Sequence, residues 1–268
     1  MAEITAAMVR ELRDRTGVAM MDCKNALAET TGDMDKAIDL LRKKGQAKQD
    51  KLASRQAREG RVAVARSLDG RSAVIVEFNC NTDFTAKSAP VQQLLDLVAN
   101  LLLADPNANV ADAPQVQAAI TATAQQTGEN VRLGRYKVVP SNGGTLGTYA
   151  HYTGKVAVIV QITGTPTDQL VKDLCLHITA ARPLALNRES VPAETVAKEK
   201  EIAVEQAKAT GKPQNIAEKI AEGKMRQFFE ERVLLDQKFV KDDTKTITQL
   251  LSAAGCKLEK YARIEVGQ

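Results

Sequence analysis

The sequence predicts an α+β fold made of several units. Three observations support this: helix-forming segments at the start of the chain, an apolar strand motif that occurs twice, and a long charged helical segment near the end. At 268 residues the chain is too long for one small core and is expected to hold two to four units. We expect a small three-helix domain, two related α+β core subdomains and an inserted antiparallel helical hairpin.

The first 45 residues have the pattern of three short helices. Thr16-Gly17 is a stop signal for the first, and Gly32-Asp33 separates the second from the third. The third is expected to stop near Gly45. A helical unit this small buries little apolar surface and should be only marginally stable alone.

Residues 46–60 are rich in charge and poor in apolar side chains, so we expect a linker or a solvated helix there. RNA binding is the alternative function for its basic residues, which are Lys48, Lys51, Arg55 and Arg58. The net charge of +4, from 37 basic and 33 acidic residues, is too small to require a nucleic-acid partner. Basic patches with interleaved aromatic residues are also missing, and aromatic residues make up only 3% of the chain.

Two segments of the chain repeat each other and predict two related subdomains. Residues 73–79 and 157–163 match in residue type at every position and are identical over the first four. Each follows a turn signal, Asp69-Gly70 or Thr153-Gly154, and each precedes an amphipathic helix pattern. A last strand is expected to return to the second subdomain, with its inward side chains at Leu258, Ala262, Ile264 and Val266. A loop at Phe239-Val240 and a helix over 246–254 should precede it.

Two Ala/Glu/Lys-rich helical segments, 196–209 and 214–231, flank Gly211-Lys212-Pro213. Glycine ends a helix and proline suits the first turn of the next, so the segment predicts a helical hairpin. Its apolar seam is thin and consists of Val196, Ala203, Ala207, Ile216, Ile220 and Met225. A long hairpin with such a seam is expected to project from the body and pack on a partner.

The predicted division of the chain follows from these patterns. It consists of a helical domain at 1–54, a linker at 55–60, a core subdomain at 61–144, a second one at 145–186 and 234–268, and the hairpin at 187–233.

Composition points to the cytoplasm. The longest apolar stretch, 94–104, is interrupted by Asp96 and Asn100 and is too short to span a bilayer. The N-terminus has no basic and then apolar leader, so we expect no secretory signal. The four cysteines are scattered, as in proteins with free thiols: Cys23, Cys80, Cys175 and Cys256. With only two histidines besides, no metal-ligand spacing is present.

The most informative segment is Asn79–Phe84, which follows an apolar strand and precedes a helix. Asn81 and Thr82 are residue types that cap helix starts, and Asp83 lies where the helix dipole favours an acid. Phe84 then sits at a strand-to-helix corner. Two interpretations remain open: a core residue of the first helical turn, or a probe inserted into another molecule.

The sequence offers little support for catalysis. The phosphate-binding loop Gly-x-x-x-x-Gly-Lys-Ser/Thr is absent. Cys80 could act as a nucleophile with His151, although a cysteine at a strand end is more often buried and inert. His177 shares a helical face with apolar residues and is expected to be structural, whereas His151 could bind a partner or be a simple surface residue.

Three motifs resemble the elongation factor Ts family of bacteria. They are Leu12-Arg13-x-Arg15-Thr16-Gly17-x-x-Met20-Met21-Asp22-Cys23-Lys24-x-Ala26-Leu27, then Asn79-Cys80-x-Thr82-Asp83-Phe84, and finally Gly211-Lys212-Pro213-x-x-Ile216-Ala217-Glu218-Lys219 with Glu222-Gly223-x-Met225. The resemblance runs from residue 2 to about 266.

The resemblance implies a guanine-nucleotide exchange factor for elongation factor Tu, the GTPase that carries aminoacyl-tRNA to the ribosome. Such a protein binds the GDP-bound and nucleotide-free partner, disturbs its Mg²⁺ and phosphate site, and releases GDP so that GTP can bind. It has no catalytic chemistry, cofactor or metal of its own, and no direct contact with nucleotide, nucleic acid or membrane is expected. The helical head would be ubiquitin-associated-like, and the hairpin would serve dimerisation.

The resemblance also implies which residues meet the partner. Thr82, Asp83 and Phe84 match the family's Thr-Asp-Phe-Val element at the magnesium site, and Thr85 replaces its Val. The other implied contacts are Lys24 in the head, Thr127 and Gly128 in place of Ile-Gly, His151 in the Tyr-x-His segment, Val240 in the tail loop, and its neighbour Lys241.

Overall fold

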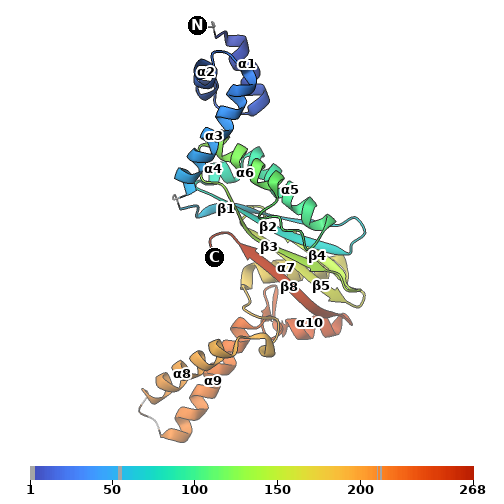
Figure 1. Ribbon diagram of the computed structural model, residues 1–268. Coiled ribbons are helices and arrows are strands. Elements are labelled where there is room, and N and C mark those ends of the chain that lie inside the picture. The colour runs from blue at the N-terminus through green and yellow to red at the C-terminus, as the bar shows by residue number, and fades with distance from the viewer. Residues whose placement is uncertain (1–3, 54–55, 210, 212) are drawn as a thin grey trace.

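The computed structural model describes residues 4–53, 56–209, 211 and 213–268. Helices and sheets are mixed, and the sheets are small and antiparallel, as the α+β prediction requires. Figure 1 shows the N-terminal helices at one end of the molecule, the sheets in the middle and the helical hairpin at the far end. Among the described helices, none combines the length and the hydropathy needed to cross a bilayer.

The N-terminal helices are α1 (Ala6–Thr16), α2 (Met20–Glu29) and α3 (Met34–Ala53). Gly17 ends α1 in the left-handed conformation, with its N–H donating to the Arg13 carbonyl. The expected stop near Gly45 was wrong, because α3 continues to Ala53. Gly45 faces the later helix α6 (Pro114–Thr127), where a Cβ atom would lie 1.3 Å from Nε2 of Gln125 and this flexible side chain would have to move aside. One helical glycine costs only about 1 kcal/mol relative to alanine, which good helix formers around it can offset.

The charged stretch 46–60 is therefore helical in its first half. Of the basic residues considered for RNA binding, Arg58 is exposed. Lys48, Lys51 and Arg55 have side chains that lie outside the described part of the chain, so that hypothesis stays untested.

The first sheet has the order β1-β2-β3, with both pairs antiparallel. Its strands are β1 (Glu59–Arg66), β2 (Ser72–Cys80) and β3 (Arg132–Pro140). Three helices connect β2 to β3: α4 (Asp83–Ala86), α5 (Ala89–Ala104) and α6 (Pro114–Thr127). Val74, Val76 and Phe78 of β2 pack on α5, so this helix covers one face of the sheet.

The second sheet has the order β4-β5-β8. Its strands are β4 (Thr145–Ala150), β5 (Val156–Thr163) and β8 (Lys257–Glu265), and α7 (Asp168–Ala181) covers its outer face. The last strand returns to β5, as predicted. Its side chains do not all point the same way: Ala262 and Ile264 face the first sheet, whereas Leu258 packs on the α7 side. A bulge opposite Gln161 and Ile162 shifts the register and thereby reverses the alternation.

The repeated sequence segments form the central strands β2 and β5, and both are buried on both faces. Ala73 and Ile75 of the first copy meet Ala157 and Ile159 of the second in a core between the two sheets. The layers are therefore α5, first sheet, second sheet and α7 (Figure 1). Double-sided burial explains why both segments are continuous apolar runs rather than alternating ones.

The hairpin consists of α8 (Ala193–Lys208) and α9 (Gln214–Arg232), and a 3₁₀ turn (Arg188–Ser190) lies at its base. It projects from the body in Figure 1. The buried seam is made of alanines, namely Ala203, Ala207, Ala217 and Ala221. Ile216 was wrongly expected in the seam; Ala217 takes that place and Ile216, one residue earlier on the helix, faces solvent. Val196 packs instead at the base, against the cluster of Ala185, Val191 and Val233 that Phe228 and Phe229 also cover.

A short hairpin and a helix lead from α9 to the last strand. They are β6 (Lys238–Phe239), β7 (Asp242–Thr246) and α10 (Ile247–Ala253). Phe239 was expected in a loop, but it ends β6 and is buried in the core beneath α7, leaving Val240 in the turn. Thr246 caps α10 in a reciprocal capping box with Gln249.

Candidate partner-binding site

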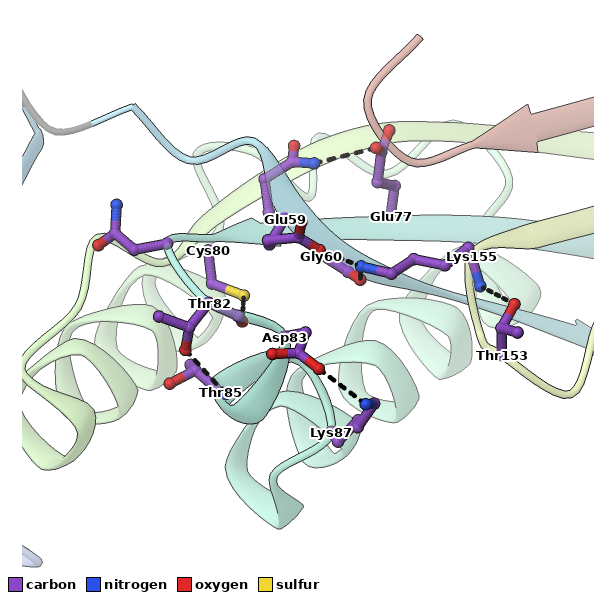
Figure 2. A network of polar contacts seen from close by, with 12 residues as sticks. Glu59, Gly60, Glu77, Cys80, Thr82, Asp83, Thr85, Lys87, Thr153 and Lys155 are labelled. Atoms are coloured by element: carbon purple, nitrogen blue, oxygen red, sulfur yellow. Dashed lines mark hydrogen bonds and ion pairs between the residues drawn. The ribbon is translucent and has the colours of Figure 1, made fainter.

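The strand β2 ends in a sharp corner that leads into the short helix α4 (Figure 2). Thr82 is the N-cap, as predicted, and its Oγ1 accepts a hydrogen bond from the Thr85 N–H at 3.3 Å. The thiol of Cys80 donates to the Thr82 carbonyl at 3.1 Å. Asn81 does not cap the helix; its side chain donates to the Gln56 carbonyl at 3.0 Å. Hydrogen bonds of Cys80 and Asn81 before the cap, and of Thr85 after it, therefore hold the corner in place.

Phe84 points away from the protein, and 83% of its surface is exposed. The next two residues, Thr85 and Ala86, are buried, because one turn of helix directs them toward the first sheet. The interpretation of Phe84 as a core residue of the first turn was therefore wrong. Thr85 lies beneath the corner, where a slightly polar side chain replaces the valine expected from the family pattern.

Asp83 forms an ion pair with Lys87, one turn further along, at 2.8 Å. This hydrogen bond, aided by the charges of Lys87 and Lys155, lowers the pKa of the exposed Asp83 carboxyl below its usual value. Asp83 is therefore an anion at neutral pH, held beside the exposed ring of Phe84.

Glu129 connects this corner to the end of α6, where Thr127 and Gly128 lie. Gly128 ends α6 in the left-handed conformation, with its N–H donating to the Ala124 carbonyl. The next residue, Glu129, accepts the Thr82 hydroxyl at 2.6 Å and the Thr82 N–H at 3.0 Å. The structure thus brings Thr127 and Gly128 next to the Thr82–Phe84 segment, although 43 residues or more separate them in the chain.

The β4–β5 turn carries His151 and lies at the same end of the sheets. Lys155 forms an ion pair with Glu59 and donates to the Gly60 carbonyl at 3.1 Å. Glu59 is paired in register with Cys80, the last residue of β2, so the turn borders the corner. Figure 2 shows Lys155 extending toward Glu59 and Gly60 close to Asp83.

His151 is half-buried, and its Nδ1 lies 2.7 Å from the Thr153 hydroxyl. Its ring is 4.4 Å, centroid to centroid, from that of Tyr152, which is 88% exposed. This turn therefore offers a polar ring and an exposed aromatic ring beside the Phe84 corner.

Two predicted contact segments lie elsewhere. Lys24 is exposed on α2, close in sequence to the exposed Met20 and Met21. Val240 and Lys241 occupy the β6–β7 turn on the α7 side of the second sheet. The structure does not place either segment at the corner, so a partner that touches all of them must extend over a large part of this chain.

The Val240 turn is fixed to α7 by two polar contacts. The Val240 N–H donates to Nδ1 of His177 at 3.3 Å, and Lys241 pairs with Asp173 at 2.7 Å. Nε2 of His177 lies 3.0 Å from Oε1 of Gln237, so Nε2 carries the proton of a neutral ring. His177 has no exposed surface, and burial lowers its pKa. Its predicted structural role is confirmed.

The structure gives no support to Cys80 as a nucleophile. The thiol is buried, and desolvation together with the nearby Glu129 raises its pKa to about 11. Cys80 is therefore a neutral thiol at neutral pH, whereas the reactive form of cysteine is the thiolate. All four cysteines are free thiols, as their spacing predicted.

Sequence reasoning missed three residues of this site: Glu129, Tyr152 and Lys155. Tyr152 had a usable signal, because an aromatic residue beside the turn signal Thr153-Gly154 has little chance of burial. Glu129 and Lys155 had none, since their partners are distant in the chain and are brought close only by the fold.

Comparison with known proteins agrees with the motifs. The family model described as elongation factor TS matches residues 81–268. Proteins named elongation factor Ts are 44% identical in Thioalkalivibrio sulfidiphilus and 42% in Methylococcus capsulatus, each over 273 residues, 99% of this chain and 92% of the relative. The one from Lactiplantibacillus plantarum is 41% identical over 276 residues, 100% of this chain and 94% of the relative. The chain belongs to the elongation factor Ts family.

Proposed function

We propose that this protein binds GDP-loaded elongation factor Tu, disturbs the partner's Mg²⁺ and phosphate site with the Phe84 corner, and releases GDP so that GTP can bind. One observation carries the proposal: Phe84 is exposed at a corner whose backbone is fixed by hydrogen bonds. A rigid, outward aromatic side chain is suited to insertion into a preformed pocket of another protein. We further propose that the exchange takes place in the cytoplasm and requires no catalytic chemistry or cofactor from this chain.

Further exposed apolar side chains lie in or next to other segments that are expected to meet the partner. Within the described chain, three of the segments expected to meet the partner, besides the Phe84 corner, contain exposed apolar side chains. Met20 and Met21 precede Lys24, Tyr152 follows His151, and Val240 precedes Lys241. Exposed apolar residues rimmed by polar ones mark protein interfaces. We propose that the three-helix domain and the α7 side of the second sheet hold the partner while the corner acts on its nucleotide site.

The mechanism follows from linkage. Mg²⁺ requires nearly ideal octahedral geometry, so a side chain that fits only the distorted site weakens nucleotide binding. The nucleotide weakens binding of the exchange factor by the same factor. Each ~1.4 kcal/mol of this coupling corresponds to a tenfold change in nucleotide affinity. Asp83, anionic and next to Phe84, would add repulsion toward the phosphates or compete for groups around the metal.

One side chain cannot supply the whole effect. Burial of Phe84 in the partner would contribute ~1.5–3 kcal/mol, and truncating such an anchor costs ~2 kcal/mol or more. The contacts around Lys24, Thr127-Gly128, His151 and Val240-Lys241 must therefore share the free energy needed to hold the distorted state.

For the helical hairpin we propose self-association. Its outer groove between α8 and α9 has apolar walls from Val196, Val204, Met225 and Phe229, flanked by charged Lys200 and Glu222. A groove with both charges at its rim is complementary to a second copy of itself. Sedimentation of the chain with and without elongation factor Tu would give the stoichiometry.

The test of the proposed function is direct. The purified chain is mixed with elongation factor Tu loaded with a fluorescent GDP, and release is followed by stopped flow with excess unlabelled GDP. We expect release to accelerate with the concentration of the chain and a nucleotide-free complex to be isolated by gel filtration. Release at the intrinsic rate at all concentrations would refute the proposal.

A further inference from the structure

We propose that Glu129 is a positioning residue for nucleotide exchange: it holds the corner so that Phe84 is presented in one fixed orientation. The inference rests on the proposed function and extends it to a residue after α6 that contacts the corner from within the protein. Its two carboxylate oxygens together accept three hydrogen bonds from Asn81 and Thr82, immediately before the Asp83-Phe84 pair.

The geometry of the contact is specific. Oε2 of Glu129 accepts the N–H groups of Asn81 and Thr82 at 3.1 and 3.0 Å, and Oε1 accepts the Thr82 hydroxyl at 2.6 Å. Hydrogen bonds to an ionised carboxylate are about twice as strong as neutral ones. The same hydroxyl oxygen of Thr82 accepts the Thr85 N–H, so Glu129 fixes the residue that starts α4.

A second contact strengthens the connection between the end of α6 and the corner. The Asn130 N–H donates to Oδ1 of Asn81 at 2.8 Å. Glu129 and Asn130 directly follow Gly128, which ends α6, and each of them thus contacts the corner. Thr127-Gly128 and Phe84, both proposed to meet the partner, are therefore joined into one unit.

This rigidity has a consequence for exchange. Phe84 lies two residues beyond Thr82, and α4 is only four residues long, too short to hold itself in place. Without the carboxylate, the N–H groups of Asn81 and Thr82 and the Thr82 hydroxyl would lose their acceptor, so the corner would be held less tightly and binding would have to order it further. Ordering a side chain on binding reduces the free energy available to the interaction.

The experiment measures GDP release from elongation factor Tu with Glu129→Ala, Glu129→Gln and the matched control Glu189→Ala, an exposed glutamate at the base of the helical hairpin. We expect Glu129→Ala to slow release about three- to tenfold, the range for ordering one contact segment. Glu129→Gln should slow release less than Glu129→Ala, because its amide oxygen can accept both N–H groups and its NH₂ can donate to the Thr82 hydroxyl, although these bonds lose the strengthening by charge. Glu189→Ala should match wild type.

A double-mutant cycle with Phe84→Ala distinguishes positioning from a direct contact. If Glu129 acts through Phe84, adding Glu129→Ala to Phe84→Ala slows release no further. An equal effect of Glu129→Ala with and without Phe84, or no effect in the wild-type background, would overturn the inference. If Glu129→Ala does not fold, judged by circular dichroism, Glu129→Asp gives the same test, because it keeps the charge but is one methylene shorter.

The result separates this inference from the proposed function. When Phe84→Ala slows release and Glu129→Ala does not, the inference fails and the proposed function stands. When the wild-type chain itself does not accelerate release, the proposed function fails.

Discussion

Phe84 and its two neighbours show how a short helix directs side chains. The cap at Thr82 sets the first turn, which buries Thr85 and Ala86 and leaves the Phe84 ring in solvent. The residue pattern alone was compatible with either orientation, because a four-residue helix has no periodicity to read. The identity of the capping residue could be predicted from sequence, whereas the direction of the ring depended on where the helix meets the sheet.

The low reactivity expected of the Cys80 thiol, at the same corner, can be tested. Since its pKa is about 11, against an ordinary value of 9.0, its thiolate fraction at neutral pH should be roughly 100-fold lower than that of an unperturbed thiol. We expect iodoacetamide to modify it very slowly in the folded protein and much faster in urea, as measured by peptide mass spectrometry. Rapid selective modification of folded Cys80 at pH 7 would revive the nucleophile hypothesis.

His177 predicts a pH dependence of stability. Burial lowers its pKa below 6.5, and the hydrogen bond with Gln237 opposes this only in part. The unfolded chain therefore takes up a proton at a higher pH than the folded protein. The contribution of His177 to the free energy of unfolding should be constant above the ordinary histidine pKa and fall as the pH drops below it. Protonation would also remove the acceptor of the Val240 N–H.

The measurement is urea unfolding between pH 7.5 and 5, with His177→Gln as the comparison. The variant should show a flatter profile in this range. The acids with lowered pKa values, such as Asp33 and Asp242, titrate below their ordinary 3.8 and affect a separate, more acidic range. A profile that is the same for both proteins would contradict the role assigned to His177.

At the scale of elements, the helical hairpin depends on small side chains. Ala203 and Ala207 of α8 face Ala217 and Ala221 of α9, which allows a close approach of the two helices. The sequence could predict two helices and the break between them, because Gly211 and Pro213 are strong local signals. It could not identify Ala217 rather than Ile216 as the seam residue, because hydrophobicity favours the larger side chain and only the interhelical distance favours the smaller.

Ala203→Leu should therefore destabilise the hairpin. Extra volume in a packed seam typically costs about 1–3 kcal/mol. Hydrogen exchange of the α8 and α9 amides would locate the effect in the hairpin, away from the sheets. Ala197→Leu, at an exposed position of the same helix, is the control and should change stability by no more than about 0.5 kcal/mol. Equal protection in both variants would show that the seam tolerates a large side chain.

At the scale of the whole molecule, two sheets back to back separate the proposed contact surfaces. The Phe84 corner and the His151 turn lie at one end of the sheets, and the Val240 turn lies beyond α7. The repeat of residues 73–79 at 157–163 predicted two strands, and each copy is the central strand of its own sheet, because double-sided burial leaves a continuous apolar run in sequence. That the two halves pack face to face was not predictable, since the same run also suits a strand covered by helices on both faces.

The comparison of Phe84→Ala with Leu68→Ala in GDP release from elongation factor Tu tests the central claim most directly. Leu68 is a fully exposed apolar residue in the β1–β2 turn, at the end of those strands opposite to the corner, and serves as the matched control. We predict that Phe84→Ala folds normally but slows release roughly tenfold or more, since loss of ~2 kcal/mol at an anchor exceeds the ~1.4 kcal/mol of one decade. Leu68→Ala should release GDP at the wild-type rate. Equal rates for wild type and Phe84→Ala would contradict the claim that this ring opens the partner's nucleotide site.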